Sequence, residues 1–254
     1  MEKIIVATRK NKEIYVIDNR CYKVFEKSFN KGNILNEALN HARVEETGLN
    51  IPRLLEVTMI DGQWAIVMER IDGVTMEELL ETNPDKEDEY LDRFVDIQID
   101  MQSRRCPQLK KHRDKMNSKI SQTDLSATLR YDLHNRIEST PRHNSLCHGD
   151  YNPSNVIIDK DGRPYIIDWS HATQGNVEAD AARTFLLFLL EGKNERAKKY
   201  LKKFCDRSGC NHKDVLNWLP ILAASQSVKG RRNESDLLQR LIVENEQGLE
   251  KLYA

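Results

Sequence analysis

Short runs in which apolar and polar residues alternate dominate the first 70 residues, and this period of two predicts β-strands. Such runs fill most of residues 1–25, where the turn-forming Asp18-Asn19-Arg20 separates two of them. Two more strands are expected at Leu54–Ile60 and Trp64–Glu69, joined by a turn at Asp61-Gly62. The pattern therefore predicts a small antiparallel sheet at the amino end of the chain.

One helix is expected to interrupt these strands. It begins near Asn33, and its apolar positions Leu35, Leu39 and Ala42 recur at the spacing of one helical face. Gly48 is expected to end it before Pro52.

Beyond residue 70 the apolar spacing changes to that of helices. Thr75-Met76-Glu77-Glu78 has the form of a capping box, in which a side chain caps the first turn. An apolar hairpin is expected at 156–167, with its turn at Asp161-Gly162. Amphipathic helices are expected at 91–101, 125–137, 178–191, 194–205, 215–225 (kinked at Pro220) and 235–252. The pattern thus predicts an α+β chain, with a strand-rich lobe at 1–68, a hinge at 69–74 and a mostly helical lobe at 75–254.

Composition excludes several classes of protein. The 39 Lys and Arg nearly balance the 40 Asp and Glu, so no net charge favours binding to nucleic acid. The longest apolar run, Phe185 to Leu190, is too short to span a bilayer, and the first residues lack a signal peptide. The five scattered cysteines indicate reduced thiols, so we expect a cytoplasmic protein without nucleic-acid or membrane partners.

The candidate chemistry lies in residues 147–169. Asp150 precedes Asn155 by five positions, an apolar strand follows directly, and the returning strand leads into Asp168. A hairpin would bring Asn155 and Asp168 side by side, and an amide oxygen and a carboxylate are hard ligands of the kind that Mg²⁺ prefers. Asp150, on the preceding loop, could accept a proton from an incoming hydroxyl. This combination suits phosphoryl transfer, although each residue taken alone could equally cap a turn.

The segment resembles the catalytic and metal-binding loops of the aminoglycoside phosphotransferase family, a branch of the protein-kinase-like fold that includes choline-kinase-like enzymes. His148-Gly149-Asp150 stands where protein kinases carry His-Arg-Asp, and Asp168-Trp169 stands where they carry Asp-Phe-Gly. The resemblance implies a two-lobed small-molecule kinase that uses Mg²⁺ and ATP or GTP. The acceptor would be a hydroxyl of an aminoglycoside, a choline-like alcohol, a sugar or a related metabolite.

The resemblance also assigns residues outside this segment. Lys23 is the strand lysine that would bind the α- and β-phosphates, and Glu37 is the helix carboxylate that would pair with it. The backbone around Glu69 and Ile71 in the connector would bind the purine. Asp180 would brace the catalytic loop.

The chain departs from the family at the loop expected to cover the phosphates. Residues Ala7–Glu13 contain no glycine, so close approach of the backbone to phosphate is not assured. The cationic side chains there, those of Arg9, Lys10 and Lys12, could replace backbone amides, but we expect solvated turn residues.

Two alternatives to an active small-molecule kinase follow from the sequence. A protein kinase is disfavoured because only nine residues, Ser170 to Glu178, separate the second hairpin strand from the next helix. A nucleotide-binding pseudokinase is supported only by the glycine-free loop. The acceptor itself stays open: Glu244, Glu246 and Glu250 could line an acidic pocket for a cationic acceptor, or form a solvated helix face.

Overall fold

The structure, a computed structural model, describes residues 3–9, 11–244 and 246–253. The chain divides into two compact units, Met1–Pro84 with Pro153–His171, and Asp85–Asn152 with Ala172–Ala254. Both units are discontinuous in sequence, because the hairpin after Asn152 packs with the amino-terminal residues. The lobe bounds expected from the sequence stay a prediction.

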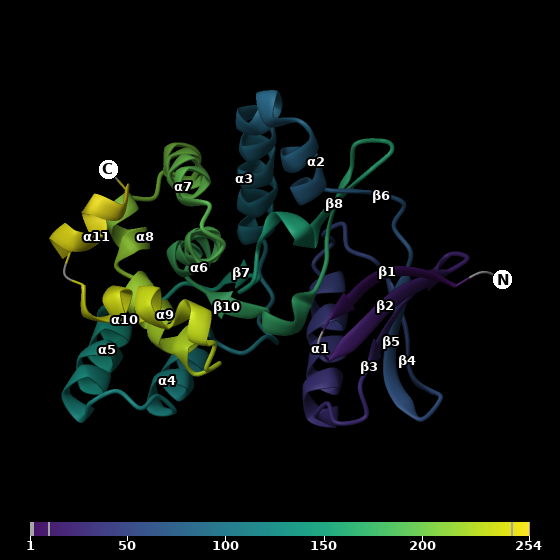
Figure 1. Cartoon of the computed structure of the whole chain (residues 1–254), viewed down its shortest axis with the longest axis horizontal. Helices are drawn as coiled ribbons and strands as arrows, with labels where there is room; N and C mark the ends of the chain where they lie inside the picture. The colour runs from purple at the N-terminus through teal and green to yellow at the C-terminus, as the bar shows by residue number, and fades with distance from the viewer. Residues whose placement is uncertain (1–2, 10, 245, 254) are drawn as a thin grey trace. The chain divides into compact units, whose positions relative to one another are not determined.

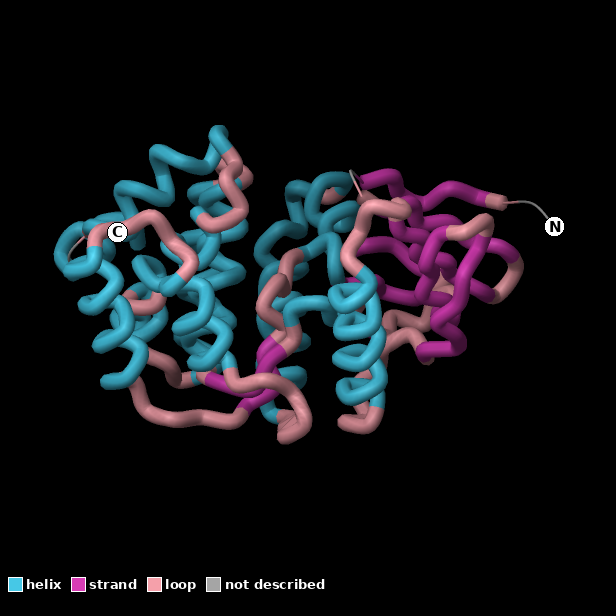
Figure 2. The backbone as a smooth tube through the Cα atoms, turned by 90° about the horizontal axis from the view of Figure 1, so that it is seen from below, coloured by secondary structure: helices cyan, strands magenta, loops and turns pink. Residues whose placement is uncertain are grey.

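A five-stranded antiparallel sheet forms the centre of the first unit, with strand order β1-β2-β3-β5-β4 (Figures 1 and 2). The two predicted strand pairs and their turns are confirmed. The strands are β1 Ile4–Arg9, β2 Lys12–Ile17, β3 Arg20–Phe25, β4 Leu54–Ile60 and β5 Gln63–Glu69.

The central strands of this sheet are covered on both faces. Phe25 and Ile66 pack with Ile34 and Ala38 of the helix on one face, and Tyr15, Val24 and Ala65 form a second cluster. Burial of this apolar area is the main source of the unit's stability.

Helix α1, Lys31–Glu45, begins with Asn30, whose side chain accepts a hydrogen bond from the Asn33 N–H at 3.1 Å. The predicted apolar face of this helix is wrong, because Leu35 and Leu39 are 42% and 48% exposed. The helix instead buries a mixed face, made of Ile34, Glu37, Ala38, Asn40, His41 and Val44. The buried face includes polar side chains because Glu37 pairs there with Lys23 of β3.

A second, three-stranded sheet completes the first unit, with order β6-β8-β9. Its strands are β6 Gly73–Thr75, β8 Val156–Asp159 and β9 Pro164–Ile166, and the last two form the predicted hairpin. Gly73 is required at its position, since a Cβ there would lie 2.3 Å from the carbonyl oxygen of Ile158. The predicted cap at Thr75 is confirmed, because its hydroxyl accepts from the Glu78 N–H at the start of α2, Met76–Thr82.

The second unit is mainly helical (Figure 1). A short antiparallel pair, β7 Ser145–Cys147 with β10 Thr173–Gly175, lies among its helices. The helices are α3 Glu87–Ser103, α4 His112–Ser121, α5 Ala127–Ser139, α6 Val177–Leu190, α7 Asn194–Ser208, α8 His212–Leu216, α9 Leu219–Ser227, α10 Ser235–Val243 and α11 Glu246–Tyr253. The structure therefore confirms the α+β fold class, with a small antiparallel sheet and a mostly helical part.

Two helices expected to be continuous are divided. The segment expected at 215–225 forms α8 and α9, because Pro220 lies in the first turn of a new helix rather than at a kink. The segment expected at 235–252 forms α10 and α11, since Glu244 adopts an extended conformation after α10. Among the described residues, none of these helices has the length and apolar character needed to cross a membrane.

Candidate active site

Strand β7 leads directly into the loop that holds Asp150. Gly149 adopts a left-handed conformation with a φ of 76°, which glycine adopts without strain. Its N–H donates to Asp180 Oδ1 at 2.7 Å, and the Gln102 amide donates to Asp180 Oδ2 at 3.1 Å. Asp180 is 2% exposed and therefore braces the turn before Asp150 from inside α6.

The other side of this loop is anchored by Tyr151. Its ring is fully buried, and its hydroxyl donates to the Phe94 carbonyl at 2.7 Å. The Thr184 hydroxyl donates to the Tyr151 carbonyl at 2.8 Å. Asp150 is therefore fixed between Gly149, which is hydrogen-bonded to Asp180, and the buried Tyr151, while its own side chain stays 30% exposed.

We expect Asp180→Ala to destabilise the protein, since two donors in the interior, the Gly149 N–H and the Gln102 amide, would lose their acceptor. Each such loss costs about 1–3 kcal/mol, so chemical denaturation should show a drop of about 2–6 kcal/mol in the free energy of unfolding. The control is Asp100→Ala, at an exposed position of α3, where a change within about 0.5 kcal/mol is expected. An equally small effect of Asp180→Ala would contradict the bracing role.

Arg183 holds the carboxylate of Asp150. Its Nη2 donates to Asp150 Oδ1 at 3.1 Å, and its Nη1 donates to Gln226 Oε1 at 3.0 Å. The Arg183 side chain is only 9% exposed. Because the guanidinium group is hydrogen-bonded through both of its terminal nitrogens, it fixes the orientation of the Asp150 carboxyl group.

In the first unit the hairpin juxtaposes the backbones of Asn155 and Asp168. The Ile167 N–H donates to the Asn155 carbonyl at 2.9 Å, directly before Asp168. Asp168 has a φ of 64°, a left-handed conformation that costs energy for a residue other than glycine. Burial of the adjacent Trp169, whose Nε1 donates to the Ile166 carbonyl at 3.1 Å, helps to hold this conformation.

Asp168 is the centre of an ionic cluster in which Lys23 and Glu37 are buried and Asp168 and Lys12 are half-buried. Lys23 Nζ lies 3.1 Å from Asp168 Oδ1, and Lys12 Nζ lies 3.2 Å from Asp168 Oδ2. Lys23 also donates to Glu37 Oε1. The structure therefore brings together Lys23, Glu37 and Asp168, and it adds Lys12 to them.

The charges in this cluster shift one another's pKa. Burial alone would raise the pKa of Asp168, but the ammonium groups of Lys23 and Lys12 hold it well below its usual range. Burial alone would lower the pKa of Lys23, but Asp168 and Glu37 hold it above its usual value. Asp168 is thus ionised at every physiological pH.

The oxygens here fit a magnesium ion. Among the described residues, Asp168 Oδ1 is a buried side-chain oxygen without a hydrogen-bond partner, although it lies beside Lys23. No group of three or more His, Cys, Asp or Glu side chains in the described part of the chain could hold a metal. A site that combines one carboxylate and one amide with phosphate oxygens suits Mg²⁺ rather than zinc.

Lys12 corrects one expectation from the sequence. It was expected to be a solvated turn residue. Instead it is the first residue of β2, and its side chain, which is only 23% exposed, pairs with Asp168. Burial and repulsion from Lys23 lower the pKa of Lys12. Lys10 lies outside the described residues, as does the side chain of Arg9.

The hinge residues lie at the end of β5. The Glu69 N–H donates to the Arg53 carbonyl at 2.9 Å, and the Glu69 carboxylate accepts from Arg53 Nε at 3.2 Å. Ile71 is half-buried. The Glu69 N–H therefore already has a partner within the first unit.

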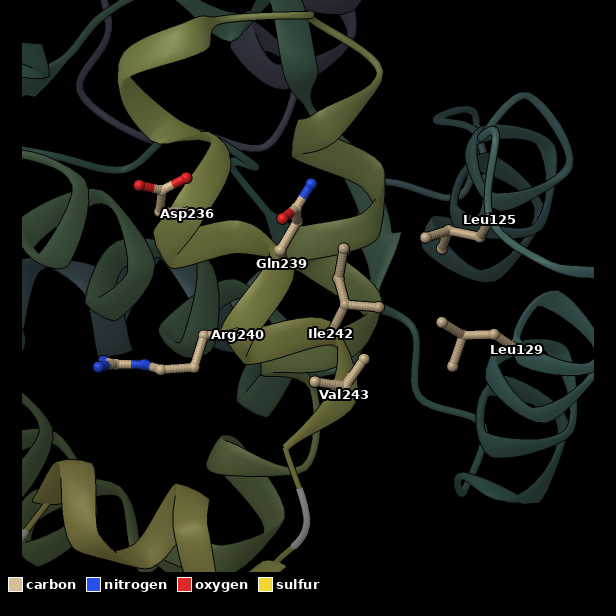
Figure 3. A pocket seen from close by; sticks show the side chains of 7 residues that line it. All are labelled: Leu125, Leu129, Asp236, Gln239, Arg240, Ile242 and Val243. Atoms are coloured by element: carbon tan, nitrogen blue, oxygen red, sulfur yellow. The ribbon is translucent and has the colours of Figure 1, made fainter.

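A pocket of about 590 Å³ lies elsewhere in the second unit (Figure 3). Leu125, shortly before α5, and Leu129, in its first turn, point toward Ile242 and Val243 of α10. None of the site residues expected from the sequence lines it. Its lining combines these four apolar side chains with Asp236, Gln239 and Arg240, and it does not include Asp150.

Two of the three acidic positions near the carboxyl end have described side chains. Glu250 pairs with Lys213 at 2.9 Å, and Glu244 ends α10 next to Gly248. The side chain of Glu246 lies outside the described residues.

Comparison with known proteins agrees with this geometry. In a search of solved structures, aminoglycoside phosphotransferase APH(4)-Ia in complex with AMP-PNP and hygromycin B superposes with a TM-score of 0.69 at 16% identity, covering 100% of this chain and 94% of that one. Choline kinase LicA from Streptococcus pneumoniae superposes with a TM-score of 0.65 at 16% identity, covering 99% and 94%. At such identities the likeness shows the fold.

Sequence comparison is more specific to the family. A search of curated proteins finds no match. Residues 11–211, however, match the profile of the phosphotransferase enzyme family APH. This span covers most of the chain and contains the Asp150 loop, the hairpin and the ionic cluster around Asp168. The chain therefore belongs to the APH phosphotransferase enzyme family.

Proposed function

We propose that this protein is a kinase that transfers the γ-phosphate of ATP to a hydroxyl group of a small molecule. The observation that carries the proposal is the ionic cluster of Lys23, Glu37 and Asp168, in one chain with a braced loop that presents Asp150. Buried charges are costly to the fold, so a cluster of them is better explained by a ligand than by stability alone.

Asp150 is the proposed catalytic base. It accepts the proton of the acceptor hydroxyl as the hydroxyl oxygen bonds to the γ-phosphorus and the bond to the β–γ bridging oxygen breaks, with ADP as leaving group. Arg183 is a positioning residue, because it holds the Asp150 carboxyl group from a buried site.

The first unit is proposed to bind the nucleotide. Lys23 contacts the α- and β-phosphates, and Glu37 orients Lys23. Asn155 and Asp168 would hold Mg²⁺, which when bound neutralises charge on the phosphate oxygens. The Glu69 carbonyl and the Ile71 N–H bind the purine edge.

Lys12 is proposed as a second phosphate-binding cation that compensates for the glycine-free loop. Lys12→Gln should therefore raise the KM for ATP about 10-fold, the loss expected for one charge-assisted hydrogen bond. Steady-state kinetics with varied ATP would measure it. Lys27→Gln, at an exposed lysine of the same unit, should leave that KM unchanged, and an equal KM for both variants would argue against the role of Lys12.

Two observations on relatives support the cofactor and the acceptor class. Two structures of APH(4)-Ia contain AMP-PNP or ADP together with hygromycin B, and a choline kinase shares the fold. We infer an adenine nucleotide and a hydroxylated small molecule, with GTP as a cofactor to be tested alongside. The cysteines that the structure records are all free thiols, which fits the proposed cytoplasmic location.

The test is ATP-dependent incorporation of phosphate into a panel of aminoglycosides, amino alcohols, sugars, sugar acids, nucleosides and generic protein substrates. Labelling of a small molecule, lost in Asp150→Asn, would support the proposal. Labelling of a protein alone would indicate a protein kinase. Nucleotide binding without transfer to any acceptor would indicate a pseudokinase.

A further inference from the structure

A line of hydrogen bonds leads away from Asp150 through the second unit. Arg183, which donates to Asp150, also donates through its Nη1 to Gln226 Oε1 at 3.0 Å. Gln226 Nε2 donates in turn to Glu234 Oε2 at 2.7 Å, and Arg231 Nη1 donates to Glu234 Oε1 at 2.9 Å. Each contact has the length of an ordinary hydrogen bond, so these side chains form one connected chain.

Three elements of the second unit supply this chain. Arg183 lies on α6, Gln226 lies on α9, and Glu234 ends the short 3₁₀ turn that leads into α10. Helix α9 packs against both α6 and α10, so helix packing holds the three positions together. Gln226 and Glu234 are only 3% and 6% exposed. Because burial of a polar group is costly unless the group finds a partner, both side chains depend on these hydrogen bonds.

The chemistry of its two ends fixes the direction of the chain. A guanidinium group only donates hydrogen bonds, and a carboxylate that pairs with a guanidinium, as Glu234 does with Arg231, only accepts them. The Gln226 amide lies between Arg183 and Glu234, so its oxygen must face the first and its nitrogen the second. In the reverse orientation, two donors would face each other at Arg183. The charge of Glu234 therefore selects the amide orientation that holds Arg183.

We propose that Gln226 and Glu234 are positioning residues for phosphoryl transfer. Glu234 orients the Gln226 amide, and the amide oxygen holds one nitrogen of the Arg183 guanidinium. The other terminal nitrogen of Arg183 fixes the carboxyl group of Asp150. The inference rests on the proposed function, because it takes Asp150 as the base that receives the proton of the acceptor. A base held in one orientation is already arranged for the transition state, so disorder in Arg183 should lower kcat.

A purely structural role is the alternative, since the same hydrogen bonds also fasten the turn between α9 and α10. The two roles predict different results. A structural role changes the stability of the fold, whereas a positioning role changes the kcat of protein that is fully folded. Circular dichroism and thermal unfolding would identify the temperature at which each variant is folded, and kinetics at that temperature separates kcat from KM.

The first test needs no acceptor. It measures the order of the Arg183 guanidinium by NMR in the full chain labelled with ¹⁵N-arginine, with Arg183→Lys to identify the Nε–Hε signal. We expect an order parameter of about 0.85 in the wild type, as for rigid backbone, and a value below about 0.6 in Gln226→Leu. Glu195→Gln, at an 85% exposed side chain of α7, should match the wild type. A rigid Arg183 in Gln226→Leu, or a mobile one in the wild type, would overturn the proposal.

A charge swap tests the orientation of the amide without a change in side-chain size. In Glu234→Gln no carboxylate selects the orientation of the Gln226 amide, so the amide can turn its nitrogen toward Arg183. Adding Gln226→Glu restores the pattern, because the carboxylate at 226 accepts from Arg183 and from the amide nitrogen at 234, whose oxygen then faces Arg231. The double variant has the net charge of the wild type.

The second test measures kcat and KM with the acceptor that the transfer panel identifies. We expect kcat to fall about 10–100-fold in Gln226→Leu, which loses a hydrogen bond to a charged group, and about 3–10-fold in Glu234→Gln. The double variant should return to within about threefold of the wild type. The KM for ATP should stay unchanged in all three variants, since other residues are proposed to bind the nucleotide.

The outcomes separate this proposal from the proposed function. A wild-type kcat in folded Gln226→Leu and Glu234→Gln would overturn the positioning role, and so would a double variant as slow as Glu234→Gln. Phosphate transfer by the wild type to no acceptor would instead contradict the proposed function. In that case the NMR measurement still decides whether Gln226 and Glu234 hold Arg183.

Discussion

Asp150→Asn is expected to lower kcat by about 10²–10⁴-fold, the range in which a positioned general base contributes. The amide oxygen of Asn keeps the shape of the side chain and can still accept from Arg183, but it cannot take the proton of the acceptor. The affinity for Mg·ATP should stay within about twofold, since the nucleotide contacts belong to other residues. Single-turnover kinetics and nucleotide titrations on the same preparation would measure both values.

The control for this substitution is Asp132→Asn at an exposed position of α5, which should leave kcat unchanged. Transfer by Asp150→Asn at near wild-type rates, with a verified acceptor, would refute the assignment of Asp150 as the base. A fall in nucleotide affinity as large as the fall in kcat would point to a structural role instead.

Asp168→Ala is expected to abolish the part of nucleotide binding that depends on Mg²⁺. In the wild type, Mg·ATP should raise the melting temperature more than ATP with a chelator does, because ligand binding stabilises the folded state. The variant loses the carboxylate proposed to bind the ion, so Mg·ATP and ATP with a chelator should give the same melting temperature. Thermal unfolding with and without Mg²⁺ measures this directly.

The same substitution also leaves the ionic cluster with an excess of positive charge. Lys23 and Lys12 would lose a shared partner, and the free energy of unfolding should drop by about 3 kcal/mol, as for a broken buried ion pair. Asp168→Asn provides a milder variant for the metal test, and Asp161→Ala in the exposed hairpin turn is the control. Unchanged stabilisation by Mg·ATP in both Asp168 variants would contradict the metal role.

Much of the fold was readable from local patterns. Alternating strands, the turns at Asp18 and Asp61 and the cap at Thr75 depend on neighbours in sequence, and all three are confirmed. The hairpin that juxtaposes Asn155 and Asp168 is also local. The pairing of Lys23 with Glu37 came from the family resemblance, and the structure places these two side chains in contact.

The features that were missed depend on distant contacts. Periodicity counts apolar residues, so it selected Leu35 and Leu39 on α1, whereas the helix turns Glu37 inward to reach Lys23. Lys12 looks like any turn lysine until Asp168 is brought next to it. Arg183 sits in an apolar helix 33 positions from Asp150, and a buried cation within such a helix is the one signal that could have marked it.

The most direct test of the proposed function is the fate of the γ-phosphate. Mass spectrometry after incubation with Mg²⁺, γ-¹⁸O-labelled ATP and the acceptor panel would follow the label into products. We predict a labelled phosphate monoester of a small molecule that forms with the wild type and not with Asp150→Asn. Label found only in inorganic phosphate or in protein, across the whole panel, would contradict the proposal that this chain is a small-molecule kinase.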